Sequence, residues 1–180
     1  MKNRVAVQCG VLSCVLFSSL LAGAAAKAGN EALERWVGGT WPLEGKMLDT
    51  DYSTATTVTG VSKCGWSPDH VFMLCDQSLV VNGKPDRDLS AYVFDAESGK
   101  FHFYGLSPKG EKARTSDLDI SADGKHWEYH NTSEIKGKKV QFRTINEFRN
   151  ADHIDWWSEY STDEGQHWTK MGGGSEMREK

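Results

Sequence analysis

Apolar and polar residues alternate along most of this chain, and turn sequences interrupt the alternation about every eight to twelve residues. Alternation of this kind is typical of a β-strand with one buried face. Asn-Gly and Asp-Gly pairs and Gly- or Pro-containing triplets between the runs supply turns. The pattern predicts strands at 53–63, 71–81, 89–94, 101–106, 114–121, 125–133, 138–148, 153–161, 166–171 and 175–179.

The connections between these expected strands are short, and none has the length of a Greek-key crossover. A sandwich or a barrel would fit the strand spacing. An all-β, up-and-down antiparallel β-barrel of about ten strands is the simpler solution, because closure removes exposed strand edges. A barrel of this size is wide enough to leave room for one small ligand.

Helical spacing is convincing only at 30–37, where Leu33, Trp36 and Val37 share one face. Asn30 can cap this short N-terminal helix, and the Gly38-Gly39 pair ends it.

The first residues have the pattern of a secretory signal peptide. Lys2 and Arg4 precede an apolar run, which is followed by small residues, so we expect cleavage after Ala26, with Ala28 as a second option. The run is too short and interrupted for a confident membrane span, and a lipoprotein site at Cys14 is the weaker alternative. We therefore expect a signal peptide at 1–26, a single domain at 27–180, and a periplasmic or secreted protein.

Two cysteines remain after this cleavage, Cys64 and Cys75. If 68–71 forms a hairpin loop, they lie opposite each other on neighbouring strands, and an exported protein favours a disulfide between them. A metal-binding or redox pair is the alternative, but the spacing is a poor zinc signature.

Cleavage would take the formal net charge from −4 to about −6, which argues against nucleic acid and anionic membrane surfaces as partners. The oligomeric state is open. We expect no metal and no cofactor. His126, Glu128 and His130 share one face of a strand, but if Trp127 points inward they form a wet outer surface. No nucleophile elbow, phosphate loop or dinucleotide fingerprint occurs.

The stretch 161–168, STDEGQHW, resembles the Asp-box of sialidase propellers, and 121–127, SADGKHW, is a near-copy. Both span expected hairpins, where Asp and Gly build the turn and Ser can bond the loop. A propeller would need several such boxes at blade spacing, so we interpret both as turn chemistry, with no catalytic residue.

Aromatic residues on the expected inner face are candidates for ligand contacts. The predicted ligand-binding residues are Phe103, Phe142, Arg143, Trp156 and Tyr160. Arg143 can form a buried polar handle with Glu147, although a surface ion pair is the favoured interpretation of this pair.

Two features at the chain ends resemble the calycin superfamily, which includes lipocalins. Gly39-Thr40-Trp41 comes directly after the helix, and it matches the Gly-x-Trp motif that begins the first strand of lipocalins. Arg178 lies near the C-terminus. The chain also resembles a family of short bacterial secreted domains of unknown function, through Leu33, CGWSPDHVFMLCDQ and YSTDEGQHWTKMG.

This resemblance implies structural roles for Gly39, Trp41 and Arg178, with Arg178 stacked on Trp41 at one barrel end. Pro42 departs from the pattern, so the first strand must tolerate a missing donor at an edge or a bent start. The function expected is binding of a small apolar or amphipathic ligand by an exported barrel. Alternatives are a structural or partner-binding module with a filled barrel, and a hydrolase-type enzyme using carboxylates and His on barrel strands.

Overall fold

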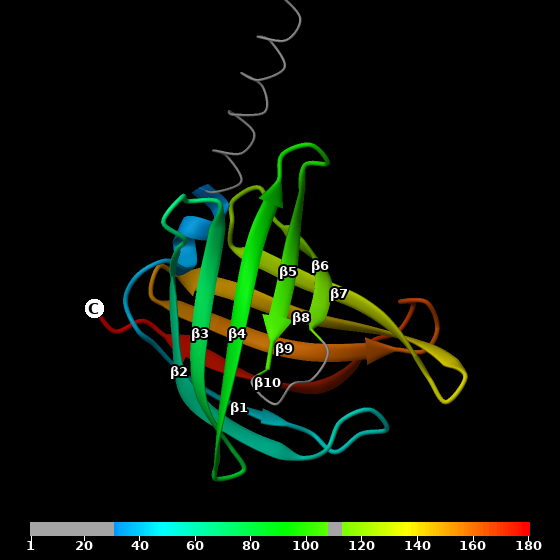
Figure 1. The fold of residues 1–180 in the computed structure, drawn as a ribbon. Coiled ribbons are helices and arrows are strands. Elements are labelled where there is room, and N and C mark those ends of the chain that lie inside the picture. Colours follow the sequence, from blue (N-terminus) through cyan, green and yellow to red (C-terminus); the bar gives the residue numbers. More distant parts are fainter. Residues whose placement is uncertain (1–30, 108–112) are drawn as a thin grey trace, which may run out of the picture.

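Ten antiparallel strands form a closed barrel in the computed structural model, which describes residues 31–107 and 113–180 (Figure 1). The expected signal peptide, the Asn30 cap and the turn at 108–110 lie outside the described residues. The elements are η1 (Glu34–Trp36), β1 (Trp41–Met47), β2 (Thr56–Trp66), β3 (Phe72–Val81), β4 (Lys84–Asp95), β5 (Lys100–Leu106), β6 (Arg114–Ile120), β7 (His126–Ile135), β8 (Lys138–Asn150), β9 (His153–Ser161) and β10 (Thr169–Met177).

Each strand pairs with its neighbours in sequence, and β1 pairs with β10 to close the barrel. The predicted up-and-down barrel is therefore confirmed. The hairpin register at the cysteines is also as expected, with Cys64 opposite Cys75 and Trp66 opposite Met73. The two sulfurs form a disulfide, and the Cα atoms are 4.1 Å apart.

The last strand differs from the prediction, which divided it into two short pieces. β10 is one strand with three consecutive glycines and a bulge between Lys170 and Gly172. A Cβ on Gly174 would lie 1.9 Å from the Glu44 carbonyl oxygen, and one on Gly173 would lie 2.6 Å from that of Trp156. The glycines therefore continue the strand where neighbouring backbones approach too closely for side chains.

The helix before the barrel is shorter than expected. Helical residues 31–33 lead into the 3-10 turn η1, and Val37 is already extended. Gly38 and Gly39 have φ angles of 79° and 72°, which suit glycine. The Gly38 N–H donates to the Cys64 carbonyl, 3.0 Å away, so this segment is held against β2.

The strand that contains Pro42 is not an edge, because the barrel is closed. Pro42 pairs with Val61 of β2, and β1 pairs continuously with β10 only from Leu43 onward. A separate bridge joins Thr40 to Glu179. The interruption between these two contacts accommodates the missing N–H of Pro42.

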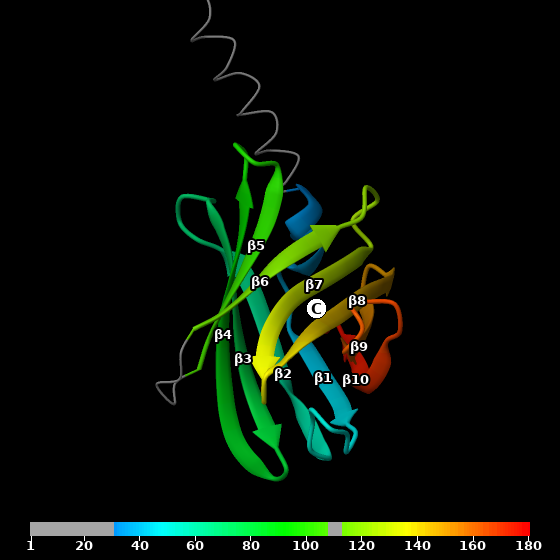
Figure 2. The same cartoon turned by 90° about the vertical axis from the view of Figure 1, so that its right-hand side faces the viewer.

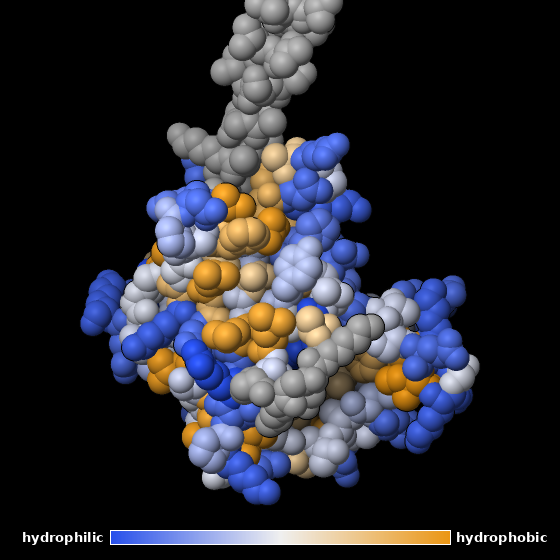
Figure 3. Space-filling view, in the orientation of Figure 1, coloured by the Kyte–Doolittle hydropathy of each residue, from blue (hydrophilic) through white to orange (hydrophobic). Residues whose placement is uncertain are grey.

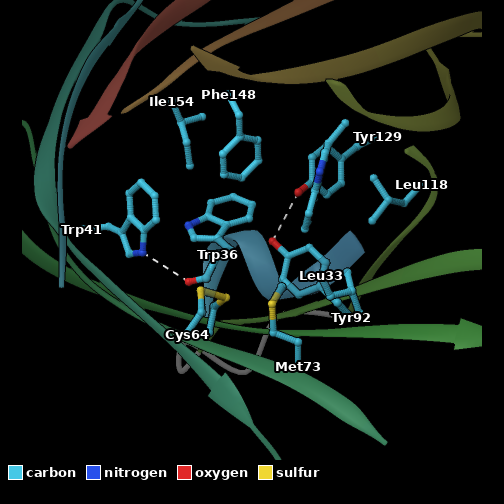
Figure 4. Close-up of a cluster of buried hydrophobic side chains, with 12 residues drawn as sticks. Leu33, Trp36, Trp41, Cys64, Met73, Tyr92, Leu118, Tyr129, Phe148 and Ile154 are labelled. Carbon is cyan, nitrogen blue, oxygen red and sulfur yellow. Dashed lines mark hydrogen bonds between the residues drawn. A yellow bond between two sulfur atoms is a disulfide. The ribbon is translucent and has the colours of Figure 1, made fainter. Parts of the chain in front are cut away.

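A core fills the half of the barrel that η1 enters (Figure 4). Trp36 is at its centre, and its ring centroid lies 5.4 Å from that of Trp127 and 6.0 Å from that of Phe148. The Trp41 indole N–H donates to the Trp36 carbonyl, 3.2 Å away. The Arg178 guanidinium carbon lies 4.4 Å from the centroid of Trp41, and Arg178 also donates to the carbonyl of Arg35.

The outer face of β3, β4 and β5 carries exposed apolar side chains (Figure 3). Leu74 pairs across the sheet with Ala91, which pairs with Tyr104, and Leu89 pairs with Leu106. These side chains therefore form a continuous outer surface rather than isolated apolar residues.

Candidate ligand-binding cavity

The half of the barrel beyond the core contains a cavity of about 380 Å³. Its wall is amphipathic, with carbon-rich side chains and hydrogen-bonding groups interleaved. The apolar and aromatic lining residues are Trp36, Leu43, Val58, Leu79, Tyr92, Phe103, Tyr129, Phe142 and Trp156. The polar lining residues include Gln77, Asp88, Ser90, Arg114, Ser116, Asn131, Thr144, Asn146 and Glu176.

Four of the five predicted ligand-binding residues are brought together on the cavity wall: Phe103, Phe142, Arg143 and Trp156. Trp156 occupies the space above the glycines of the neighbouring strands. A Cβ on Gly45 would lie 2.2 Å from the Trp156 indole. Because Gly45 pairs with Gly174 and Gly174 pairs with Trp156, two adjacent positions without side chains make room for this indole.

Tyr160 is not part of the cavity wall. Its ring packs 4.7 Å from the ring of Tyr52, and Tyr52 also contacts Phe142 at 6.0 Å. Tyr52 belongs to the β1–β2 connection, so this aromatic group lies at the barrel end opposite η1. Tyr160 is also the cross-strand partner of Phe142, so the two residues pack together with Tyr52.

Arg143 is among the residues that line the cavity, but its guanidinium is held by other partners and is not a free polar handle. It bonds Glu159 at 2.7 Å and Glu128 at 3.2 Å, and lies 4.1 Å from the centroid of Trp168. Strand alternation explains this, because Phe142 points inward and the next side chain must point outward. The predicted partner Glu147 instead bonds His126 at 2.8 Å.

The inner end of the cavity contains a chain of buried hydrogen bonds. The Asn146 amide donates to the Tyr129 hydroxyl at 3.2 Å. This hydroxyl donates to that of Tyr92 at 3.4 Å (Figure 4). Burial raises the pKa of Tyr92 to about 12 and raises the pKa of Tyr129 well above its usual value. Both phenols are therefore neutral hydrogen-bonding groups at physiological pH.

Glu176 places a buried carboxyl group in this wall. The residue is 5% exposed, and its Oε2 atom has no hydrogen-bond partner. Its cross-strand neighbours, Leu43 and Ile154, are apolar. Burial raises the pKa of Glu176 to about 8, and the nearby Trp36 indole opposes this shift. The Trp36 Nε1 atom is also buried without a hydrogen-bond partner.

A second carboxyl group, that of Asp88, lines the same cavity. One of its oxygens, Oδ2, is paired with the more exposed Arg114, whereas the other, Oδ1, is buried without a hydrogen-bond partner. Burial is the main cause of the raised pKa of Tyr92, and the negative charges of Glu176 and Asp88 raise this pKa a little more. Both carboxyl groups therefore lie near this phenol.

The barrel wall is weakest between β6 and β7, which diverge in Figure 2. These strands share four residue pairs, from Asp117 with His130 to Ile120 with Trp127, whereas β7 and β8 share ten. A second cavity of about 340 Å³ lies beside the unpaired part. Its wall includes Phe103, Ser116 and Asn131, which also line the first cavity. The two cavities therefore meet at this side of the barrel.

The His126, Glu128 and His130 triplet lies on the outer face, opposite the buried Trp127. His126 contacts Glu128 at 3.5 Å, and His130 contacts Asp119 at 3.1 Å. Within residues 31–107 and 113–180, no group of three or more His, Cys, Asp or Glu is arranged to hold a metal ion.

The sequence analysis missed Glu176, Asp88, Asn146 and the Tyr92–Tyr129 pair. Strand alternation could have grouped some of these residues with others on the same strand face. Asp88 shares a face with Tyr92, and Glu176 shares a face with Gly174. That signal does not distinguish an inner from an outer face. The division of β10 into two pieces also concealed its register.

In the described parts of the chain, no helix is long and apolar enough to cross a membrane.

Two comparisons of the sequence with known proteins found no match. No protein-family model matches the sequence, and no curated protein matches it.

Among solved structures, the chain is similar to the S-type phycobiliprotein lyase CPES from Guillardia theta, with a TM-score of 0.57 and 11% identity. The match covers 88% of this chain and 97% of that chain. The resemblance to the bacterial domain family stays a prediction, but the fold is established: the chain is a closed, lipocalin-like barrel of ten antiparallel strands that shares the fold of this lyase structure.

Proposed function

We propose that this protein is an exported lipocalin-like barrel that binds a small amphipathic molecule in its interior cavity, to which all ten strands contribute lining residues. The observation that carries the proposal is the cavity itself. Its volume of about 380 Å³ is in the range of small-molecule sites, and its wall combines aromatic faces with a few polar groups.

Export rests on the sequence of 1–26 and on the Cys64–Cys75 disulfide. Disulfides persist in oxidising compartments such as the periplasm or the extracellular space. The ligand would therefore be met outside the cytoplasm, where a barrel can sequester or carry a poorly soluble molecule.

The two alternative functions fit the cavity less well. A filled barrel would extend the aromatic core past Trp36, but the cavity begins there. A hydrolase that uses carboxylates and His would need both at the cavity. Glu176 and Asp88 supply carboxyl groups there, but none of the described residues that line the cavity is His. The His126–Glu147 pair lies on the outer face.

Native mass spectrometry of protein from the exported fraction tests the proposal. We expect a bound mass that is lost on denaturation, and the purified protein should enhance the fluorescence of the apolar probe N-phenylnaphthylamine. Gln77→Trp would fill part of the cavity and should abolish both signals. Ser78→Trp places the same side chain on the exposed face of β3 and is the matched control.

The proposal fails if the protein carries no bound mass and does not bind the probe. It also fails if Ser78→Trp reduces binding as much as Gln77→Trp, because binding would then not involve the interior.

A further inference from the structure

We infer that the cavity selects ligands that carry a protonated amine or a comparable cationic group, which pairs with Glu176 while the apolar part lies against the aromatic wall. This inference rests on the proposed function and names the chemical class of the ligand. It begins with the unpaired acceptor atoms of the cavity.

Two carboxyl oxygens are buried here without a hydrogen-bond partner, Glu176 Oε2 and Asp88 Oδ1. Leaving such an atom unpaired in a folded protein is destabilising, and a ligand that donates a hydrogen bond recovers this cost. A cationic donor recovers the most, because charge-assisted hydrogen bonds are stronger than neutral ones.

The charges around the cavity favour a cation over an anion. Arg114 is already paired with Asp88, and the guanidinium of Arg143 is bound to carboxylates on the outer face. Arg178, two residues after Glu176, does not line the cavity and is held over Trp41, against the Arg35 carbonyl and 3.8 Å from the Asp152 carboxylate. None of these three cations is free to neutralise a ligand carboxylate, whereas Glu176 lacks a cationic partner.

The aromatic wall completes the site. Trp36, Tyr92 and Trp156 line the cavity with Glu176. Aromatic faces attract cations and also provide apolar contact area for the ligand body. An amine on an aromatic or alkyl body therefore satisfies both parts of the wall at once.

Three probes with the same body test the inference: phenylbutylamine, phenylbutanol and phenylbutyrate, each titrated by calorimetry. We expect the amine to bind at least about tenfold more tightly than the alcohol, and the acid to bind most weakly. Glu176→Gln should remove the advantage of the amine over the alcohol. Glu44→Gln removes a carboxylate from an exposed position on β1 and should leave the order unchanged.

Binding of the amine should also release a proton. Glu176 holds a proton below about pH 8 in the free protein and must lose it to pair with an ammonium group. The Trp36 indole lies beside it, and the titratable groups that share the cavity wall with it are Tyr92 and Asp88 of β4, Tyr129 of β7 and Arg114 of β6. Both tyrosines stay neutral, so the proton comes from Glu176.

At about pH 6.5, the heat of amine binding should therefore differ between phosphate and Tris buffers by the release of roughly one proton. This difference should be absent in Glu176→Gln. If Glu176→Gln lost amine binding because it misfolded, it would also lose binding of the alcohol. Thermal unfolding of the variant is therefore measured as a control for folding.

Equal binding of amine and alcohol, tighter binding of the acid, or an unchanged preference in Glu176→Gln would overturn the inference and leave the proposed function intact. If none of the three probes and no apolar dye binds, the proposed function itself fails.

Discussion

Glu176 lies in β10 beside glycines and faces apolar partners, which makes it chemically different from the exposed glutamates of the same chain. Burial removes its hydration and raises its pKa to about 8. Gly172 and Gly174 contribute no side chains that could pair with it. The same residue type at Glu44, one strand away, is exposed.

The raised pKa of Glu176 predicts how stability depends on pH in the free protein. The folded state holds the proton more tightly than the unfolded state, so this contribution is fully present below the unfolded pKa of 4.5 and is lost as pH rises towards about 8. Urea unfolding should show wild-type stability falling relative to Glu176→Gln by up to about 1.4 kcal/mol per pH unit across this window. A constant difference between the two proteins would contradict the buried, protonated state.

At the scale of elements, three hairpin turns use one hydrogen-bond pattern. The serine hydroxyl donates to the aspartate two residues later in Ser67–Asp69, Ser121–Asp123 and Ser161–Asp163. In the third turn, the STDEGQHW stretch, the Ser161 hydroxyl also accepts from the Gly165 N–H at 2.9 Å. The Asp-box resemblance is therefore local turn geometry that ends β9, as the sequence analysis predicted.

Substitution of Ser161 tests this turn. Ser161 is buried, so Ser161→Ala leaves the Gly165 N–H without its partner and should lower the free energy of unfolding by about 1–2 kcal/mol. Thr162→Ala, at the exposed neighbouring position, should change it by less than about 0.5 kcal/mol. Equal effects would show that the hydroxyl does not support the hairpin.

At the scale of the whole molecule, the N-terminal segment, β1 and the C-terminus close one end of the barrel. Thr40 pairs with Glu179, and Arg178 reaches the Arg35 carbonyl. The Cys64–Cys75 disulfide lies in the core behind this closure, and the Gly38 N–H bonds the Cys64 carbonyl. These contacts therefore close one end of the barrel, and the other end contains the cavity.

Removal of the disulfide should destabilise the whole barrel. Cys64→Ala with Cys75→Ala should lower the free energy of unfolding by about 2–4 kcal/mol, because the cross-link restricts the unfolded chain. Protein from the exported fraction should show no free thiol when unfolded without reductant, and its intact mass should lack residues 1–26. A free Cys64 or Cys75 thiol in that protein would contradict the disulfide, and a full-length mass would contradict the expected cleavage.

The sequence by itself determined most of the architecture, because strand alternation and hairpin turns are local signals. It predicted the barrel, the opposition of Cys64 and Cys75, and the inward faces of Trp156 and Phe142. Only the tertiary structure decided which polar residues meet inside. Glu176 and Asp88 come from strands that are not neighbours, and a period of two does not say which face is enclosed. Phe142 and Arg143 are neighbours on one strand, so when one points inward the other must point outward. The closed barrel shows that Phe142 is the inward one.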